Sequence, residues 1–138
     1  MKAASWAWIV ASAALACAPA GDQPDQKSIQ EGRTYTAWLY GSEYHKLWER
    51  FSPEMRQTFG SVTDLASFAS RAVKHLGAEQ GNVDEQVNVA EPYRVYTRSA
   101  AFDKSRQRML IEWSLAKDGA VTGLVVRPAV VDSSRGER

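Results

Sequence analysis

The strongest constraint on the fold is a change in hydrophobic periodicity near Gly81. Before this glycine, apolar residues recur every three or four positions, which is typical of amphipathic helices. After it, apolar and polar residues alternate, which is typical of half-buried strands. Helices that precede all the strands indicate an α+β fold. The sequence therefore predicts N-terminal helices packed on an antiparallel sheet of about four strands.

The first two helices are expected on either side of Gly41. The first covers Ser28–Tyr40 and ends at Gly41 as a C′ residue, although Gly32 interrupts it. Ser42 then offers a side-chain oxygen as N-cap of the second helix. The second helix carries an apolar stripe at helical spacing, which consists of Tyr44, Leu47, Trp48 and Phe51.

Two further helices follow, each with a serine at its start. Ser52 is a suitable N-cap and Pro53 a suitable first helical residue for a short third helix. Ser61 or Thr63 caps the fourth helix, which ends at Gly77. Its buried face is expected to contain Val62, Leu65, Phe68, Ala69, Ala72, Val73 and Leu76.

Four strands are expected after Gly81, over residues 83–89, 93–102, 109–115 and 121–127. Asp118-Gly119 predicts a two-residue type I′ turn between the last two. Such a turn sets Trp113 opposite Leu124 and Ile111 opposite Val126. The side chains that then share the face toward the helices are Met109, Ile111, Trp113, Leu115, Leu124 and Val126.

The first 16 residues have the pattern of a secretory signal peptide. Lys2 precedes an uncharged apolar run, residues 3–16, which is shorter than the ~20 residues of a membrane-spanning helix. Ala14-Leu15-Ala16 before Cys17 resembles a bacterial lipobox, in which the cysteine becomes lipidated. Ala14 departs from the leucine that is usual there, and Ala18-Pro19-Ala20 is an alternative cleavage site for an ordinary signal peptidase.

This pattern divides the chain into four parts. We expect a signal peptide over residues 1–16, a lipidated Cys17 with a flexible tether over 17–27, a domain over 28–130 and a polar tail over 131–138. The resemblance to lipoproteins, with Ala18 after the cysteine, implies anchoring at the periplasmic side of the outer membrane. Cleavage at the alternative site would produce an unanchored periplasmic or secreted protein.

Charge and cysteine content exclude several classes of function. Seventeen Lys and Arg residues balance sixteen Asp and Glu residues, so the chain lacks the basic footprint of a nucleic-acid-binding domain. A single cysteine excludes an intramolecular disulfide and any zinc site with two cysteine ligands. We expect no nucleic-acid partner, no metal and no cofactor.

From about Ile29 to Val130 the chain resembles the NTF2-like superfamily, and more narrowly the bacterial DUF3887 domains. The matching segments are the first helix with its Gly41 turn, Tyr44 to Met55, Leu65 to Gly77, and Asp118 to Leu124 followed by Pro128. Ala120 and Val121 depart from the usual hairpin pattern. The resemblance implies a cone of helices wrapped by a curved sheet.

The cone that the resemblance implies would be lined mainly by apolar side chains. These are Tyr35, Trp38, Trp48, Phe51, Phe68, Met109, Ile111, Trp113 and Leu124. If the cone is open, the candidates for a polar site in it are His45, Glu112 and Tyr96. His45 and His75 are interpreted as surface residues, and Glu112 alternates away from Trp113 and so faces out of the cone. The arginines expected on the outer sheet face are Arg94, Arg98, Arg106 and Arg108.

No catalytic residues are assigned, and the sequence favours a non-enzymatic domain that binds a protein partner or a small apolar ligand. Related family members often precede a serine hydrolase, which implies an alternative role as accessory module of an envelope hydrolase acting in trans. A third alternative is a small isomerase or hydratase that uses the cone. Leu110, Val125 and Val121 are expected on the outer sheet face, where they would permit a homodimer.

Overall fold

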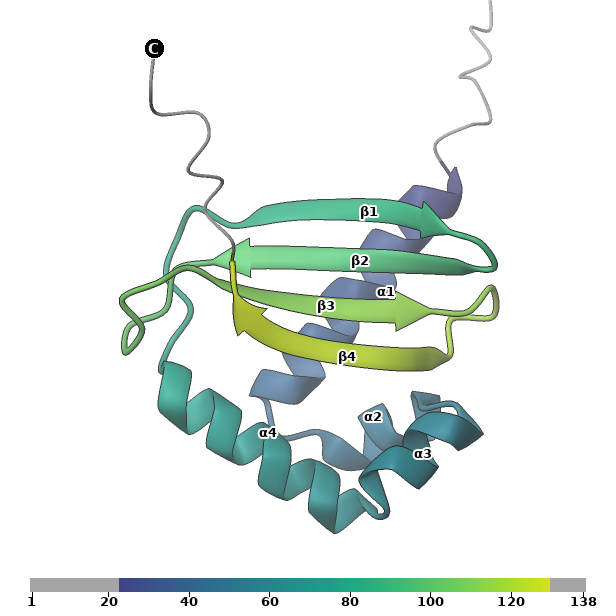
Figure 1. Cartoon of the computed structure of the whole chain (residues 1–138), viewed down its shortest axis with the longest axis horizontal. Helices are drawn as coiled ribbons and strands as arrows, with labels where there is room; N and C mark the ends of the chain where they lie inside the picture. Colours follow the sequence, from purple (N-terminus) through teal and green to yellow (C-terminus); the bar gives the residue numbers. More distant parts are fainter. Residues whose placement is uncertain (1–22, 130–138) are drawn as a thin grey trace, which may run out of the picture.

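The computed structural model describes residues 23–129 and has the expected α+β order. Four helices come first in this range: α1 (Gln23–Tyr40), α2 (Tyr44–Arg50), α3 (Pro53–Phe59) and α4 (Val62–Leu76). Four strands follow: β1 (Asp84–Ala90), β2 (Tyr93–Ala100), β3 (Met109–Leu115) and β4 (Val121–Pro128). Figure 1 shows α1 crossing one side of the sheet, with α2, α3 and α4 beyond the β4 edge. The predicted signal peptide, Cys17 and the polar tail lie outside the described residues.

Helix α1 begins at Gln23, five residues before the expected start, so it takes up the end of the segment expected to be a tether. Gly32 lies in the middle of this helix because α1 approaches the sheet most closely there. A Cβ atom at Gly32 would overlap the ring of Tyr96. The glycine that looked like a weakness in the helix is therefore a close-packing position.

The turn after α1 differs from the prediction by one residue. Ser42, and not Gly41, takes the left-handed conformation, with φ 63°. The Glu43 N–H donates to the Trp38 carbonyl at 2.9 Å, which is the long bond of a Schellman motif with Ser42 at C′. Ser42 as N-cap is therefore wrong. Glu43 occupies that position, and its side chain makes no capping hydrogen bond.

The caps of α3 and α4 are confirmed. Ser52 Oγ accepts from the Met55 N–H at 3.2 Å, with Pro53 as the first residue of α3. Ser61 Oγ accepts from the Asp64 N–H at 3.1 Å, so Ser61 and not Thr63 caps α4. These local signals depend on neighbouring residues alone, which is why the sequence predicts them well.

The strands form one antiparallel sheet in the order β1-β2-β3-β4. Trp113 pairs with Leu124 and Ile111 with Val126, as expected. The connecting turn is different, because the Gly119 N–H donates to the Ala116 carbonyl at 2.9 Å, and Gly119, with φ 84°, is the turn's one left-handed residue. The loop is thus one residue longer than a type I′ turn. A register shift beside Leu115 offsets that extra residue, so the expected pairs survive.

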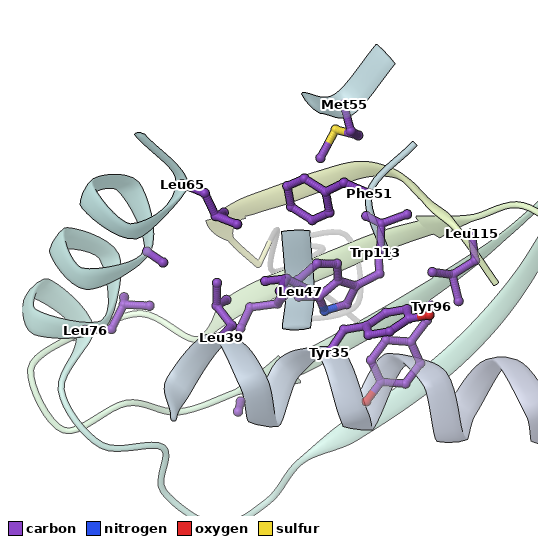
Figure 2. Packing of buried hydrophobic residues seen from close by; sticks show 14 of the residues in the cluster. Tyr35, Leu39, Leu47, Phe51, Met55, Leu65, Leu76, Tyr96, Trp113 and Leu115 are labelled. Atoms are coloured by element: carbon purple, nitrogen blue, oxygen red, sulfur yellow. The ribbon is translucent and has the colours of Figure 1, made fainter. Parts of the chain in front are cut away.

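The core lies between α1 and the inner face of the sheet, which we define as the face that carries Tyr96, Ile111 and Trp113. All three of these side chains are buried. In Figure 2 the Trp113 indole lies among Tyr35, Leu39 and Leu47. Its Nε1–H donates to Thr36 Oγ1 at 3.0 Å, so even the polar edge of the indole is bonded inside the core.

The opposite side of the sheet, which we call the outer face, is polar. Register places the following residues on it: Asp84, Gln86, Asn88, Val95, Thr97, Ser99, Leu110, Glu112, Ser114, Val125 and Arg127. Val121 was expected there and is instead fully buried, because the bulge turns the start of β4 toward Phe51. Among residues 23–129, no helix has the length and apolar character needed to cross a bilayer.

Candidate functional site

The side chains expected to line a cone pack mainly against one another. Tyr35, Phe51, Ile111 and Trp113 are buried in the core, and Trp38, Trp48, Met109 and Leu124 are partly buried against it. The partly buried Phe68 packs edge-on against Phe59 at 5.5 Å between ring centroids. Trp48, Phe68 and Met109 each line an open surface hollow. Tyr35, Ile111 and Trp113 therefore fill the space between α1 and the sheet, whereas Phe68 on α4 packs against α3.

The three candidates for a polar site do not come together. His45 is exposed on α2. Tyr96 is fully buried on the inner face, whereas Glu112 lies on the outer face opposite Thr97 and Val125. The sheet itself separates Tyr96 from Glu112. The outward direction of Glu112 agrees with the sequence prediction, and His75 is exposed as expected.

A charged network that the sequence did not indicate lies on the inner face, between β2, β1 and the segment after α4. Arg98 Nη2 and Nε donate to the two carboxylate oxygens of Glu79 at 2.5 and 3.0 Å. Its Nη1 donates to Glu85 Oε1 at 3.1 Å. Arg33 on α1 also donates to Glu85, at 2.9 Å, and the Tyr40 hydroxyl donates to Glu79 at 3.3 Å. We call these five residues the inner network.

The inner network corrects the expectation that Arg94 and Arg98 lie on the outer face. Both pair across from inner-face residues, Leu115 and Ile111, because they alternate in phase with Tyr96. Burial of the Tyr96 ring under Gly32 therefore carries both arginines inward. Because side chains alternate along a strand, Arg94, Tyr96 and Arg98 must share one face of β2. Only the contact with α1 decides that this face is the inner one.

The electrostatics of the inner network favour fixed protonation states. Burial, followed by the nearby Glu79 carboxylate, raises the pKa of Tyr40 far above its ordinary value. The hydrogen bond to Glu79 raises the pKa of Arg98 despite partial burial. A phenol that holds its proton and a guanidinium held by two carboxylates do not exchange protons near neutral pH. This arrangement is suited to holding α1 and the segment after α4 against the sheet.

The outer face has the opposite character. An open hollow of about 560 Å³ lies over it, lined mainly by polar residues that include Gln86, Thr97, Glu112 and Arg127. Within residues 23–129, none of these four side chains makes an ion pair or a side-chain hydrogen bond, and Glu112 is half-buried. A half-buried carboxylate without a partner is the kind of group that a ligand or a protein satisfies.

Neither a metal-ligand cluster nor similarity to known proteins identifies the function of the site. Across the described range, no three His, Cys, Asp or Glu side chains lie close enough together to hold a metal ion. The chain matches no protein-family model, no curated protein and no solved structure. The assignment of a function therefore depends on the residues themselves.

Proposed function

We propose that this chain is an exported, lipid-anchored domain of the NTF2-like, DUF3887 type, which binds a protein partner through the outer face of its sheet and catalyses no reaction. The supporting observation is the contrast between a filled, fully bonded inner face and an outer face on which the side chains of Gln86, Thr97, Glu112 and Arg127 lack partners within the described residues. The order of elements and the placement of the hairpin are compatible with the family resemblance.

The inner face supports binding over catalysis. An isomerase or hydratase of this fold type needs an ionisable group with a shifted pKa in a wet cavity. The strongest carboxylate candidate, Glu112, lies on the other side of the sheet, and His45 is exposed. A small apolar ligand in the cone has the same difficulty, because Tyr35, Ile111 and Trp113 take up that space.

The outer face supports a protein partner over a small molecule. Its hollow is wide and open, and its lining spans all four strands. Val125, a rare exposed large apolar residue with 41% exposure, lies beside Glu112 in the register. An apolar side chain surrounded by polar groups is typical of transient protein interfaces. Envelope location follows from the signal peptide and the Cys17 lipobox, which are features of the sequence alone.

The decisive experiment is site-specific photocrosslinking in bacterial cells that express the full chain. A benzophenone amino acid replaces Val125 on the outer face, and a matched control carries it at the exposed Lys46 on α2. We expect one dominant adduct from position 125 and none from position 46. The mass of the adduct then distinguishes a second copy of the chain from another protein, such as an envelope hydrolase.

Charge reversal at Glu112 sharpens the result. On this proposal the partner places a cation beside the Glu112 carboxylate. We expect Glu112→Lys to lower the adduct yield at position 125 about tenfold, because that cation would then lie beside a lysine. Exchange of both charges, Glu112→Lys with Arg127→Glu, restores the adduct only if the partner is a second copy that pairs the two residues across a twofold axis. An adduct yield at position 125 that Glu112→Lys leaves unchanged would overturn the proposal. A small molecule retained by the chain in native mass spectrometry would overturn it as well.

A further inference from the structure

A second surface, which is formed mainly by α4 and the loop before β3, carries positive charge around an apolar floor. One hollow of about 680 Å³ runs along the C-terminal half of α4 and is lined by Phe68, Arg71, Ala72, Lys74 and His75. Another, of about 460 Å³, is lined by residues that include His75, Lys104, Arg106, Met109 and Pro128. His75 borders both hollows, and we call the residues that line the two of them the basic groove.

The cations of the basic groove have no carboxylate partners. In the described part of the chain, the ion pairs involve Lys27, Arg33, Lys46, Arg94, Arg98 and Arg108. None involves Arg71, Lys74, Lys104 or Arg106. Arg71 donates only to the Ser67 carbonyl, at 3.1 Å, and Lys104 to the Lys74 carbonyl, at 3.5 Å. The groove thus displays unneutralised charge, with Asp103 as the one acidic residue in its loop.

This accumulation of charge is not required by the chain as a whole. The net charge is only +1, so a strongly basic composition does not explain it. The dipole of α4 favours cations in its last turn, which accounts for Lys74 and His75. It also favours Lys104, whose Nζ donates to the Lys74 carbonyl at this end of the helix. It does not account for Arg106, which comes from the loop before β3.

The apolar floor of the groove belongs to a second stripe of α4. The buried stripe of this helix consists of Leu65, Ala69 and Leu76. Phe68, Ala72 and His75 follow at i, i+4 and i+7 on an adjacent face that is partly or fully exposed. Phe68 is held from below by its edge-on contact with Phe59. A fixed apolar floor between rims of cations matches a segment that carries both acidic and apolar side chains.

We propose that the basic groove binds an acidic amphipathic segment of a protein partner, with its apolar side chains on Phe68 and Ala72 and its carboxylates beside the four cations. The observations favour a peptide over an anionic membrane. Surface docking to lipid is strengthened by apolar side chains that protrude into the bilayer beside the cations. The exposed large apolar residues of the described chain are Val89, Tyr93 and Val125, and all three lie on the sheet and outside the groove.

The test measures fluorescence anisotropy with the full chain purified in a nonionic detergent. The probe is a labelled helical peptide with glutamate on one face and leucine on the other, and its control peptide carries lysine in place of glutamate. The variant Lys74→Glu with Arg106→Glu reverses two charges whose side chains bond to nothing in the described chain. The matched control, Lys46→Glu with Lys117→Glu, reverses the charge at two exposed positions outside the groove.

We expect the acidic peptide to bind and the lysine peptide not to bind. The groove variant should weaken the affinity about tenfold, and the matched control less than twofold, because only the groove variant replaces two attractions to the peptide's glutamates by two repulsions. Equal weakening by the two variants would overturn the proposal. Binding of phosphatidylglycerol vesicles, lost in the groove variant, without binding of the peptide would also overturn it and assign the groove to lipid. Neither result depends on the variants at Glu112, Val125 and Arg127, so this proposal and the outer-face proposal can fail separately.

Discussion

The two faces of the sheet differ in whether their charged side chains are bonded to one another. On the inner face, Arg98 holds both Glu79 and Glu85, and the Tyr40 hydroxyl bonds to the same cluster. On the outer face, Glu112 and Arg127 stand two positions apart in the register of neighbouring strands and do not pair. Charges turned toward a core must be bonded, because an unpaired buried charge is very costly. Charges turned toward water are free to remain available for a partner.

This contrast identifies which charges belong to the fold. The side chains of Arg98, Glu79 and Glu85 are each less than one-fifth exposed, at 17%, 16% and 18%. Removal of one member leaves the others charged in a poorly hydrated place. The same removal on the outer face leaves groups that water solvates. Substitutions on the inner face should therefore lower the free energy of unfolding more than substitutions on the outer face. Substitutions on the outer face should have the larger effect on binding of the partner.

Arg98→Met is expected to have the largest effect. It leaves the Glu79 and Glu85 carboxylates without their shared cation, which should lower the free energy of unfolding by about 4 kcal/mol in chemical denaturation. Arg33→Met is the matched control, because Arg33 also bonds Glu85 but is 53% exposed. Its cost should stay below about 1 kcal/mol. Similar costs for the two variants would show that the inner network is as well hydrated as the outer face.

Gly32→Ala should be the next largest. Alanine normally stabilises a helix relative to glycine by about 0.5–1 kcal/mol. Here its methyl group would overlap the Tyr96 ring, so we expect a net loss of about 2 kcal/mol as α1 is displaced from the sheet. Thermal and urea unfolding measure this change. A gain in stability would mean that α1 lies farther from the inner face than the structure places it.

Alkaline pH should weaken the inner face through Tyr40. Burial raises the pKa of this phenol above its ordinary value of about 10, so the unfolded chain ionises first as the pH rises. The stabilisation is therefore present below pH ~10 and is lost above it, at up to about 1.4 kcal/mol per pH unit. Urea unfolding between neutral and alkaline pH should show a steeper loss for the wild type than for Tyr40→Phe. Parallel curves would contradict the buried position of the hydroxyl.

Glu112→Gln should have the smallest effect on stability. The side chain has no bonded partner in the described chain, so the free energy of unfolding should change by less than about 0.5 kcal/mol. Crosslinking from position 125 should nevertheless fall, since the amide lacks the charge that the proposed partner meets. A large loss of stability would assign Glu112 to the fold and remove the main support for an outer interface.

The sequence alone determined the features that depend on near neighbours. The serine caps of α3 and α4 and the change of period near Gly81 follow from short spacings. The pairing of Trp113 with Leu124 was also predictable from the position of the hairpin turn. The structure reaches the same pairing with a loop that is one residue longer and a bulge that offsets it. Such features need no knowledge of the rest of the molecule, because the interacting groups are close in the chain.

Tertiary structure decided which side of β2 is buried, and with it the character of both faces. Alternation placed Arg94, Tyr96 and Arg98 together, yet it did not distinguish the core side from the water side. The close approach of Gly32 to the Tyr96 ring settled that choice, and Arg98 then met Glu79 and Glu85 from other segments. Contacts between residues far apart in the chain depend on how α1 lies across the sheet, and no local pattern specifies that position.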